Sequence, residues 1–241
     1  AIGWATNSEQ FYYSYLIGWA FCLSITIGAY FFVVIQHLTK ARWSVVIRRI
    51  PEALIWSFPL LAVLSIPILL GMHDLYHWTH HDLFDPASAN YDPVIAGKEA
   101  YLNTPFFLAR FAFYFLSWTW ISYKLYTLSV RQDNDPHPEI APKQRKYAAI
   151  GLALGAITTA FAAFDILMSL DPHWFSTIFG IYFFAGSFMI IMAVMALVSM
   201  MLQRKGMLTG LIKVDHYQDL GKFLFGFVVF FFSRRKRWRP S

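Results

Sequence analysis

Three ionisable side chains lie inside long apolar segments of this sequence: Arg110, Lys124 and Asp165. A charge in hydrocarbon is costly, so such residues mark ion pairs, proton relays or substrate sites. Asp165 lies roughly five residues, or ~8 Å at 1.5 Å per residue, from the end of its segment, and Arg110 lies at a similar depth. We therefore expect Arg110 and Asp165 to pair, either as an inert link between helices or as part of a proton-carrying water chain.

Lys124 belongs to a polar pattern within the same segment as Arg110. Arg110, Ser117 and Lys124 are spaced by seven residues, which places them nearly on one helical face, with Tyr114 beside them. Lys124 lies near the opposite end of that segment, where a long side chain can reach the aqueous interface. Contact with the interface is the simpler interpretation of Lys124, and a place in a proton pathway is the alternative.

A histidine-rich stretch, HDLYHWTHHD, provides a second group of candidates. His73, His77 and His80 could share one face at the end of an apolar segment and there bind a metal or relay protons. A hydrated structural role is the simpler interpretation, so no metal site is predicted. None of the eight histidines lies in the middle of an apolar segment, so we expect no bis-histidine haem.

The elements that must position these residues are long apolar helices. Runs of about 18 or more apolar residues indicate membrane spans. The sequence predicts five complete transmembrane helices, at 12–38, 54–71, 105–128, 147–170 and 176–202. A sixth run, 223–232, has about half the length that a crossing needs. We therefore predict an all-α integral membrane protein, a polytopic helix bundle over residues 1–232 with a truncated sixth helix, followed by a basic tail at 233–241.

Composition excludes several classes of protein. Of the 241 residues, 57% are hydrophobic and 14% are charged, against roughly 25% charged residues in a soluble domain. The net charge of +6 comes mostly from the basic tail, so nucleic-acid binding is not expected. Cys22 is the only cysteine, which excludes an internal disulfide and a cysteine-ligated iron–sulfur cluster. Any redox centre must come from a partner, and we predict no cofactor bound by this chain.

Loop charges predict the orientation. Basic residues gather in the loops 39–53 and 129–146 and after residue 202, whereas the long loop 72–104 holds only Lys98. By the positive-inside rule, the N-terminal end and the loop 72–104 lie outside. The acidic, aromatic and proline-rich character of that loop predicts an ordered docking surface. The same alternation puts the basic tail outside, so we interpret the tail as a non-native end left by truncation or a frame error; a re-entrant last segment is the alternative.

Small residues and prolines predict two local features. Gly151, Gly155 and Thr159 recur every fourth position, which lets another helix approach closely. Pro51, Pro59 and Pro67 recur every eight residues, which predicts a kinked helix with freed carbonyl groups. Those carbonyls could line a cavity or simply pack against a neighbour.

Four stretches resemble a known family. They are LYHWTH (75–80), GKEAYLNTPFFLAR (97–110), DILMSLDPHWFSTIFG (165–180) and HYQDLGKFLFG (216–226). In order over nearly the whole chain, they are similar to the ActF-type membrane subunits of alternative complex III, which themselves resemble NrfD and the polysulfide reductase membrane subunit. The resemblance implies a subunit of a quinol:cytochrome c oxidoreductase in the bacterial cytoplasmic membrane. The segment FFSRRKRWRPS does not follow the family pattern, and spans expected at both ends are missing, so we expect a fragment.

The resemblance also implies partners and site residues. Multihaem cytochrome c and iron–sulfur subunits would dock on the periplasmic side, beside a related NrfD-like membrane subunit, and quinol or menaquinol would be the substrate. From the residue pattern and the resemblance together, the proton-pathway candidates are Asp165, Arg110, Asp171, His173 and Lys124, and the quinone-side or docking candidates are His73, Asp74, His77 and His80. A membrane anchor of a molybdopterin or nitrite reductase, and a free-standing transporter, are the alternatives. A transporter is disfavoured because internal repeats are not evident.

Overall fold

In the described part of the chain, four helices are long and apolar enough to cross a membrane. A computed structural model describes residues 8–41, 43–208 and 210–235. The four helices are α2 (Ser8–Thr39), the segmented helix Arg49–Leu70, α9 with its final turn (Ile140–Leu170) and α10 (Phe179–Arg204). The described residues form no strand. The chain is therefore an all-α, multi-pass membrane protein, and the spans predicted at 12–38, 54–71, 147–170 and 176–202 coincide with these four helices.

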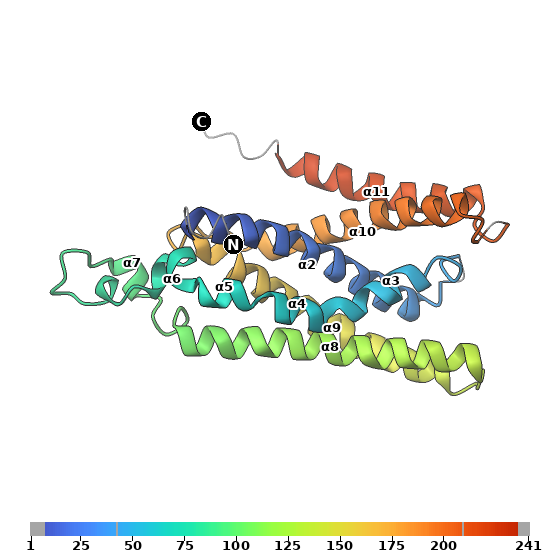
Figure 1. Cartoon of the computed structure of the whole chain (residues 1–241), viewed down its shortest axis with the longest axis horizontal. Coiled ribbons are helices and arrows are strands. Elements are labelled where there is room, and N and C mark those ends of the chain that lie inside the picture. Colours follow the sequence, from blue (N-terminus) through green and yellow to red (C-terminus); the bar gives the residue numbers. More distant parts are fainter. Residues whose placement is uncertain (1–7, 42, 209, 236–241) are drawn as a thin grey trace.

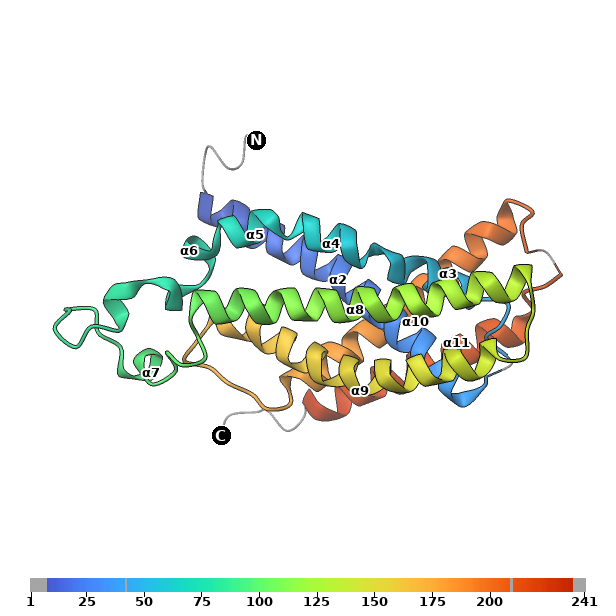
Figure 2. The same ribbon diagram turned by 90° about the horizontal axis from the view of Figure 1, so that it is seen from below.

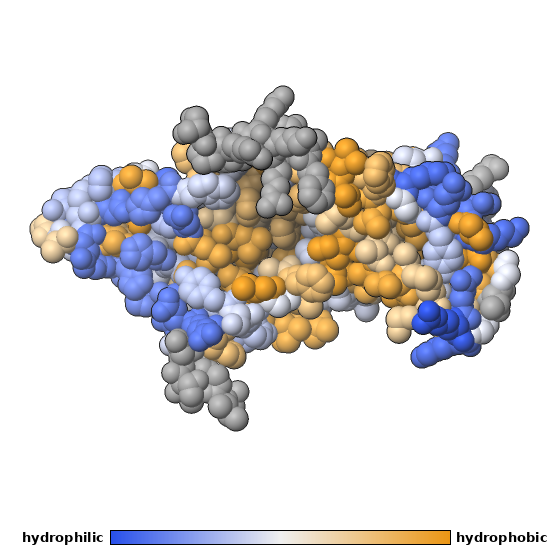
Figure 3. Space-filling view, turned by 90° about the horizontal axis from the view of Figure 1, so that it is seen from above, coloured by the Kyte–Doolittle hydropathy of each residue, from blue (hydrophilic) through white to orange (hydrophobic). Residues whose placement is uncertain are grey.

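The long helices lie side by side along the long axis of the molecule (Figures 1 and 2). They run alternately in opposite directions, so the connections gather at two ends. One end carries residues 72–104 and is called the histidine end below. The other carries the turns after α2, α8 and α10 and is called the basic end. An apolar band separates the two polar ends (Figure 3), which is the surface that a bilayer requires.

Two further helices complete the bundle. α8 (Thr104–Asn134) packs along α9, and α11 (Val214–Arg235) packs along α10. α8 is the third predicted span, but it is not among the four most apolar helices, because tyrosine, tryptophan, serine and basic residues lower its hydropathy. α11 is a continuous helix, so a re-entrant turn within residues 214–235 is wrong. Residues 236–241 of the basic tail lie outside the described residues.

The helix over Arg49–Leu70 is broken into pieces, as the spacing of its prolines predicts. Its segments are α3 (Arg49–Leu54), a 3₁₀ turn (Ile55–Ser57), α4 (Phe58–Leu64) and α5 (Ile66–Leu70). Proline lacks an N–H group and clashes with the preceding turn, which ends or kinks a helix. Side chains of α2 cover carbonyls of this segment: Trp19 donates to Leu61 O at 2.9 Å and Tyr15 to Leu64 O at 2.7 Å. These carbonyls therefore pack against α2.

The histidine end is folded into short helical turns. They are α6 (Met72–Leu75), the 3₁₀ turns His77–Thr79 and His81–Leu83, and α7 (Pro93–Ala96). Tyr76 and Trp78 anchor them by burying their rings against Phe107 of α8, with ring centroids 5.5 Å away in both cases. This region thus has its own packed side chains, as the sequence predicts.

Glycines allow α2 to lie close to both α9 and α10. A Cβ atom added to Gly155 would lie 2.6 Å from Cε1 of Tyr30, and Tyr30 donates a hydrogen bond to the carbonyl of Gly151 at 2.8 Å. The predicted close approach at these two glycines is confirmed. On the opposite side of α2, a Cβ atom added to Gly28 would lie 2.1 Å from the carbonyl oxygen of Ser187 in α10.

Replacing Gly28 by alanine is expected to destabilise the bundle by about 1–3 kcal/mol, because the new methyl group forces the backbones of α2 and α10 apart. Thermal unfolding in detergent micelles measures the effect. Gly18 in the same helix is the matched control, since a Cβ atom there meets nothing within 4 Å. Equal stability of the Gly28→Ala and Gly18→Ala proteins would show that the two helices do not pack as described.

Candidate functional site

A buried ion pair joins α8 to α9 near the histidine end. Arg110 Nε lies 2.8 Å from Asp165 Oδ2, and Arg110 Nη2 lies 3.0 Å from Asp165 Oδ1. Asp165 is 1% exposed. The predicted pairing of these two residues is therefore confirmed, and its two-pronged geometry is the strong form of an arginine–carboxylate contact.

Neighbouring groups complete the hydrogen bonding of this pair. Tyr114, one turn after Arg110, donates to Asp165 Oδ2 at 2.7 Å. Arg110 Nη1 donates to the carbonyl of Tyr101 at 3.1 Å, and the guanidinium lies 3.9 Å from the ring centre of Tyr101 and 4.2 Å from that of Phe106. Arg110 and Tyr114 are four residues apart, which brings both side chains to one face of α8. We call Arg110, Tyr114 and Asp165 the ion-pair network.

Two tyrosines outside the spanning helices lie close to Asp165. Burial, and then the negative charge of Asp165, raise the pKa of Tyr101 and of Tyr76 above their ordinary value. Both phenols therefore stay protonated at physiological pH. The Tyr76 hydroxyl donates to the carbonyl of Ile166 at 3.0 Å.

A cavity of about 340 Å³ lies beside the ion-pair network. Its walls come from the turn before α8 and from the connection between α9 and α10. Aromatic and apolar groups dominate its lining, with Lys98, Ser169 and Asp171 as the polar members; the other residues lining it are Gly97, Ala100, Tyr101, Leu102, Phe164, Met168, Pro172, Trp174 and Phe175. Tyr101 and Ser169 connect the cavity to the network, since Ser169 donates to the carbonyl of Asp165. The volume and lining suit a small ring-shaped molecule.

Asp171 and His173 lie in the exposed connection after α9. Asp171 lines the cavity, and its Oδ1 accepts a hydrogen bond from the backbone N–H of His173 at 3.1 Å. The His173 ring reaches across to Asp92, with Nε2 and Oδ2 2.6 Å apart. Asp171 and His173 are thus exposed, with Asp171 also lining the cavity, whereas Asp165 is buried and does not line it.

Asp92 fixes the start of α7 and its contact with the α9–α10 connection. It accepts hydrogen bonds from the N–H groups of Val94 at 2.8 Å and Ile95 at 3.2 Å, besides its contact with His173. Desolvation raises the pKa of Asp92, but these three partners outweigh it and lower the pKa below the ordinary value. The ionised form therefore stabilises the fold, fully above the ordinary pKa of about 3.9, and the contribution is lost as pH falls through the lower folded-state pKa.

Replacing Asp92 by asparagine is expected to speed hydrogen exchange several-fold in residues 92–97 at neutral pH, because the charged partner of His173 is lost. Hydrogen exchange read by mass spectrometry checks this. The wild-type segment should approach the behaviour of the variant only in strong acid, below the folded-state pKa of Asp92. Asp74→Asn is the control, because Asp74 is exposed. Protection that stays unchanged in Asp92→Asn would remove Asp92 from the contact.

The predicted histidine group is present as a surface cluster. The ring centres of His73 and His80 are 4.0 Å apart, and those of His77 and His80 are 5.6 Å apart. His80 Nε2 lies 3.1 Å from the carbonyl of His73, and Asp74 is exposed beside them. Among the described residues, no group of three or more His, Cys, Asp or Glu side chains is arranged to hold a metal ion. His73 and His77 are exposed, so the cluster is part of the polar surface of the histidine end.

Lys124 lies away from the ion-pair network, towards the basic end of α8. Its Nζ is 5.7 Å from the ring centre of Tyr123 and 6.0 Å from that of Tyr147. Tyrosine rings are common where a membrane meets water. These contacts favour the interfacial interpretation of Lys124.

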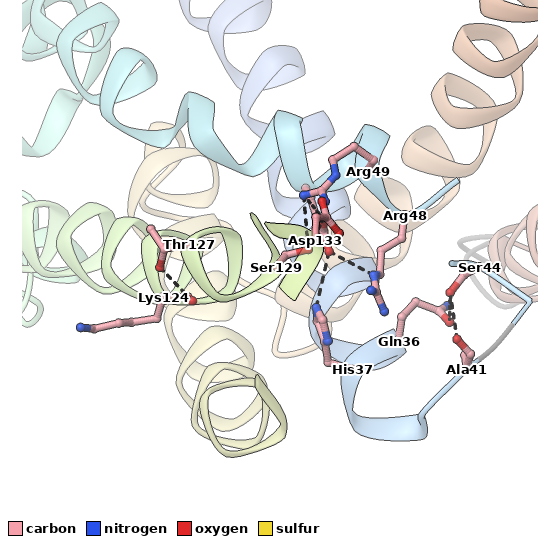
Figure 4. A network of polar contacts seen from close by, with 11 residues as sticks. Gln36, His37, Ala41, Ser44, Arg48, Arg49, Lys124, Thr127, Ser129 and Asp133 are labelled. Atoms are coloured by element: carbon pink, nitrogen blue, oxygen red, sulfur yellow. Dashed lines mark hydrogen bonds and ion pairs between the residues drawn. The ribbon is translucent and has the colours of Figure 1, made fainter. Parts of the chain in front are cut away.

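Sequence reasoning missed a second buried carboxylate, Glu52, at the basic end. Glu52 is 1% exposed, with Arg48 Nε and Arg49 Nη1 each 3.0 Å from its oxygens. Ser129 of α8 donates to it at 2.8 Å, and His37 of α2 lies 3.6 Å away. Figure 4 shows His37 of α2, Ser129 of α8, and Arg48 and Arg49 at the start of α3 close together, with Arg49 also paired to Asp133. The available signal was a carboxylate three and four residues after two adjacent arginines, at the start of an apolar run.

Comparisons with known proteins do not assign this chain to a family. No protein-family model matches the sequence, and no curated protein matches it. The function must therefore be argued from the geometry of the site, together with the resemblance of the four sequence stretches. The two features of the site that bear on function are the ion-pair network and the cavity beside it.

Proposed function

We propose that this chain is a membrane subunit of a respiratory quinol:electron acceptor oxidoreductase, in which the histidine end supports quinol oxidation and proton release. The observation that carries the proposal is a buried, hydrogen-bonded carboxylate, Asp165, beside an aromatic-lined cavity at the polar surface. The resemblance to ActF-type subunits of alternative complex III supports the same reading. The complex would be the enzyme, and its electron acceptor would be cytochrome c.

The proposal includes five complete spans and a partial sixth. Phe113, Leu116 and Trp120 of α8 are exposed, so this face needs lipid, while Arg110 on the other face is neutralised by Asp165. These facts support α8 as the fifth span. α11 would be the partial sixth. With the positive-inside rule, the basic end faces the cytoplasm and the histidine end faces the periplasm of a bacterial inner membrane.

The cavity offers groups suited to a quinol. Oxidation of a quinol to a quinone releases two electrons and two protons, so the site needs an apolar slot, a proton acceptor and an electron acceptor. Tyr101, Phe164 and Trp174 provide flat surfaces for the ring. Asp171 reaches both the cavity and water, so with His173 it can carry a proton outwards.

The ion-pair network would hold the Asp165 carboxylate in a fixed position behind the cavity. Arg110 and Tyr114 hold the Asp165 carboxylate by three hydrogen bonds. In this proposal the carboxylate takes part in the proton route from the cavity, and Arg110 offsets its negative charge. Electrons would pass to haem c and iron–sulfur centres of partner subunits that dock on the histidine end, beside a second NrfD-like membrane subunit.

A transporter remains the competitor from another class. Broken helices are typical of transporters, where unwound backbone coordinates the substrate at the middle of the membrane. The helix over Arg49–Leu70 is broken, but Trp19 and Tyr15 of α2 donate hydrogen bonds to two of its carbonyl groups. This arrangement favours packing over substrate coordination.

Affinity purification tests the proposal. The tagged chain would be extracted from its native bacterial membrane in a mild detergent, and haem absorbance and the co-purifying subunits would be measured. We expect multihaem cytochrome c and iron–sulfur subunits, with cytochrome c reduction on adding a menaquinol analogue. Recovery with a molybdopterin subunit would favour the anchor of another reductase, and recovery alone with solute uptake in vesicles would favour a transporter. Either result would overturn the proposal.

A further inference from the structure

A second and larger cavity opens at the basic end, apart from the proposed quinol site. It measures about 820 Å³ and lies where the end of α2, the turn after it, the end of α8 and the start of α9 meet. The side chains lining it are Gln36, His37, Lys40, Ala41, Val45, Arg48, Gln132, Asp133, Pro136, Ala141, Gln144 and Arg145. Figure 4 shows part of this region, with His37, Gln36 and Arg48 close together.

The lining has an excess of positive charge. Of its basic side chains, Arg48 is paired with Glu52, at 3.0 Å. The acidic member, Asp133, is paired with Arg49. No ion pair in the described part of the chain neutralises Lys40 or Arg145, so both are available to an anion that enters the cavity.

An unpartnered buried donor points to the same kind of ligand. Gln144 is 3% exposed, lines the cavity, and its amide nitrogen has no hydrogen-bond partner in the described part of the chain. A buried polar group without a partner is unfavourable, so an acceptor in the cavity would stabilise it. Gln144 and Arg145 are neighbours in the second turn of α9.

We propose that this cavity binds a phosphate-bearing anion through Lys40, Arg145 and Gln144. Basic pockets between spans on the cytoplasmic side are suited to anionic lipid headgroups. A cavity of about 820 Å³ has room for a glycerol phosphate as well as for a phosphate alone. Exposed Val45 and the side chain of Pro136 give it an apolar wall that a lipid would contact. A lipid headgroup and free phosphate both present a negatively charged phosphate group, and the competition experiment below distinguishes the two.

Binding to the full chain in a neutral detergent tests the site, with dioctanoyl phosphatidylglycerol as the probe and dioctanoyl phosphatidylcholine as the neutral comparison. We expect phosphatidylglycerol to bind at least tenfold more tightly than phosphatidylcholine. Lys40→Gln combined with Arg145→Gln should weaken phosphatidylglycerol at least tenfold, and Gln144→Leu several-fold. Lys143→Gln is the matched control, because Lys143 is an exposed neighbour on α9 that pairs with Glu139 and does not line the cavity.

Competition with inorganic phosphate identifies the source of the anion. Displacement of the lipid by phosphate at a similar concentration would show that phosphate alone suffices, and failure of displacement would show that the lipid headgroup is required. Thermal unfolding confirms that each variant is folded. Equal affinity for the two lipids would overturn the proposal. So would a loss of affinity in Lys143→Gln as large as that in the double variant, or unchanged affinity in a folded protein that carries both Lys40→Gln and Arg145→Gln.

Discussion

Replacing Asp165 by leucine is expected to lower the free energy of unfolding by about 3–5 kcal/mol, because it leaves a buried guanidinium without its counter-charge. The side chain of Asp165 is 2% exposed and that of Arg110 is 11% exposed, so water can replace few of the hydrogen bonds that Arg110 loses. Tyr114 loses its acceptor as well. Reversible unfolding in mixed detergent micelles measures the change.

A double variant measures the interaction energy between Arg110 and Asp165 separately from the contacts that each makes with other residues. Arg110→Met combined with Asp165→Leu should be less destabilised than Asp165→Leu alone, because the second change removes the unpaired charge. The exposed pair Lys143–Glu139 is the control, and Glu139→Gln should change stability by about 0–1 kcal/mol. Strictly additive effects of the two changes at Arg110 and Asp165 would contradict the coupling that the structure shows.

The second large effect concerns turnover. In the purified complex, Asp165→Asn is expected to slow quinol-dependent cytochrome c reduction at least tenfold, and as far as the roughly 10²–10⁴-fold range that acid–base groups contribute. Asparagine keeps the shape of the side chain and an acceptor oxygen for Tyr114, but it also removes the counter-charge of Arg110, so turnover is compared only in complexes whose thermal unfolding shows them to be folded. Turnover per haem c is the quantity to measure.

Lys124→Gln is the control for that experiment. Lys124 also lies in α8, but its side chain lies near the rings of Tyr123 and Tyr147, in the half of the helix towards the basic end. It should keep wild-type turnover. If Asp165→Asn also kept wild-type turnover at equal haem content, Asp165 would be a purely structural partner of Arg110 and the proposed proton route would be wrong.

The ion-pair network shows what sequence alone can predict about a site. Two opposite charges at the same depth in neighbouring apolar segments have few stable alternatives to pairing, so Arg110 and Asp165 could be joined without a structure. The hydrogen bond from Tyr114 follows from its position one helical turn after Arg110. The four most apolar spans and the proline-broken helix were likewise predictable, because length and proline chemistry determine them.

The remaining contacts depend on residues distant in sequence. Glu52 is buried only because His37 of α2 and Ser129 of α8 meet it, and a count of basic loop residues does not reveal that meeting. The contact between His173 and Asp92 joins two connections that are 81 residues apart. Such contacts follow from how the helices pack, so the two cavities could not be located from the pattern of residues.

Both proposed sites depend on sidedness, and cysteine labelling tests it most directly. Ala89→Cys at the histidine end and Asn134→Cys at the basic end would be placed singly in a Cys22→Ser background, and intact cells would be treated with a membrane-impermeant maleimide. We predict that the protein altered at Ala89 is labelled at once and that the protein altered at Asn134 is labelled only after the membrane is opened. Labelling of both positions in intact cells, or of Asn134 alone, would contradict the account.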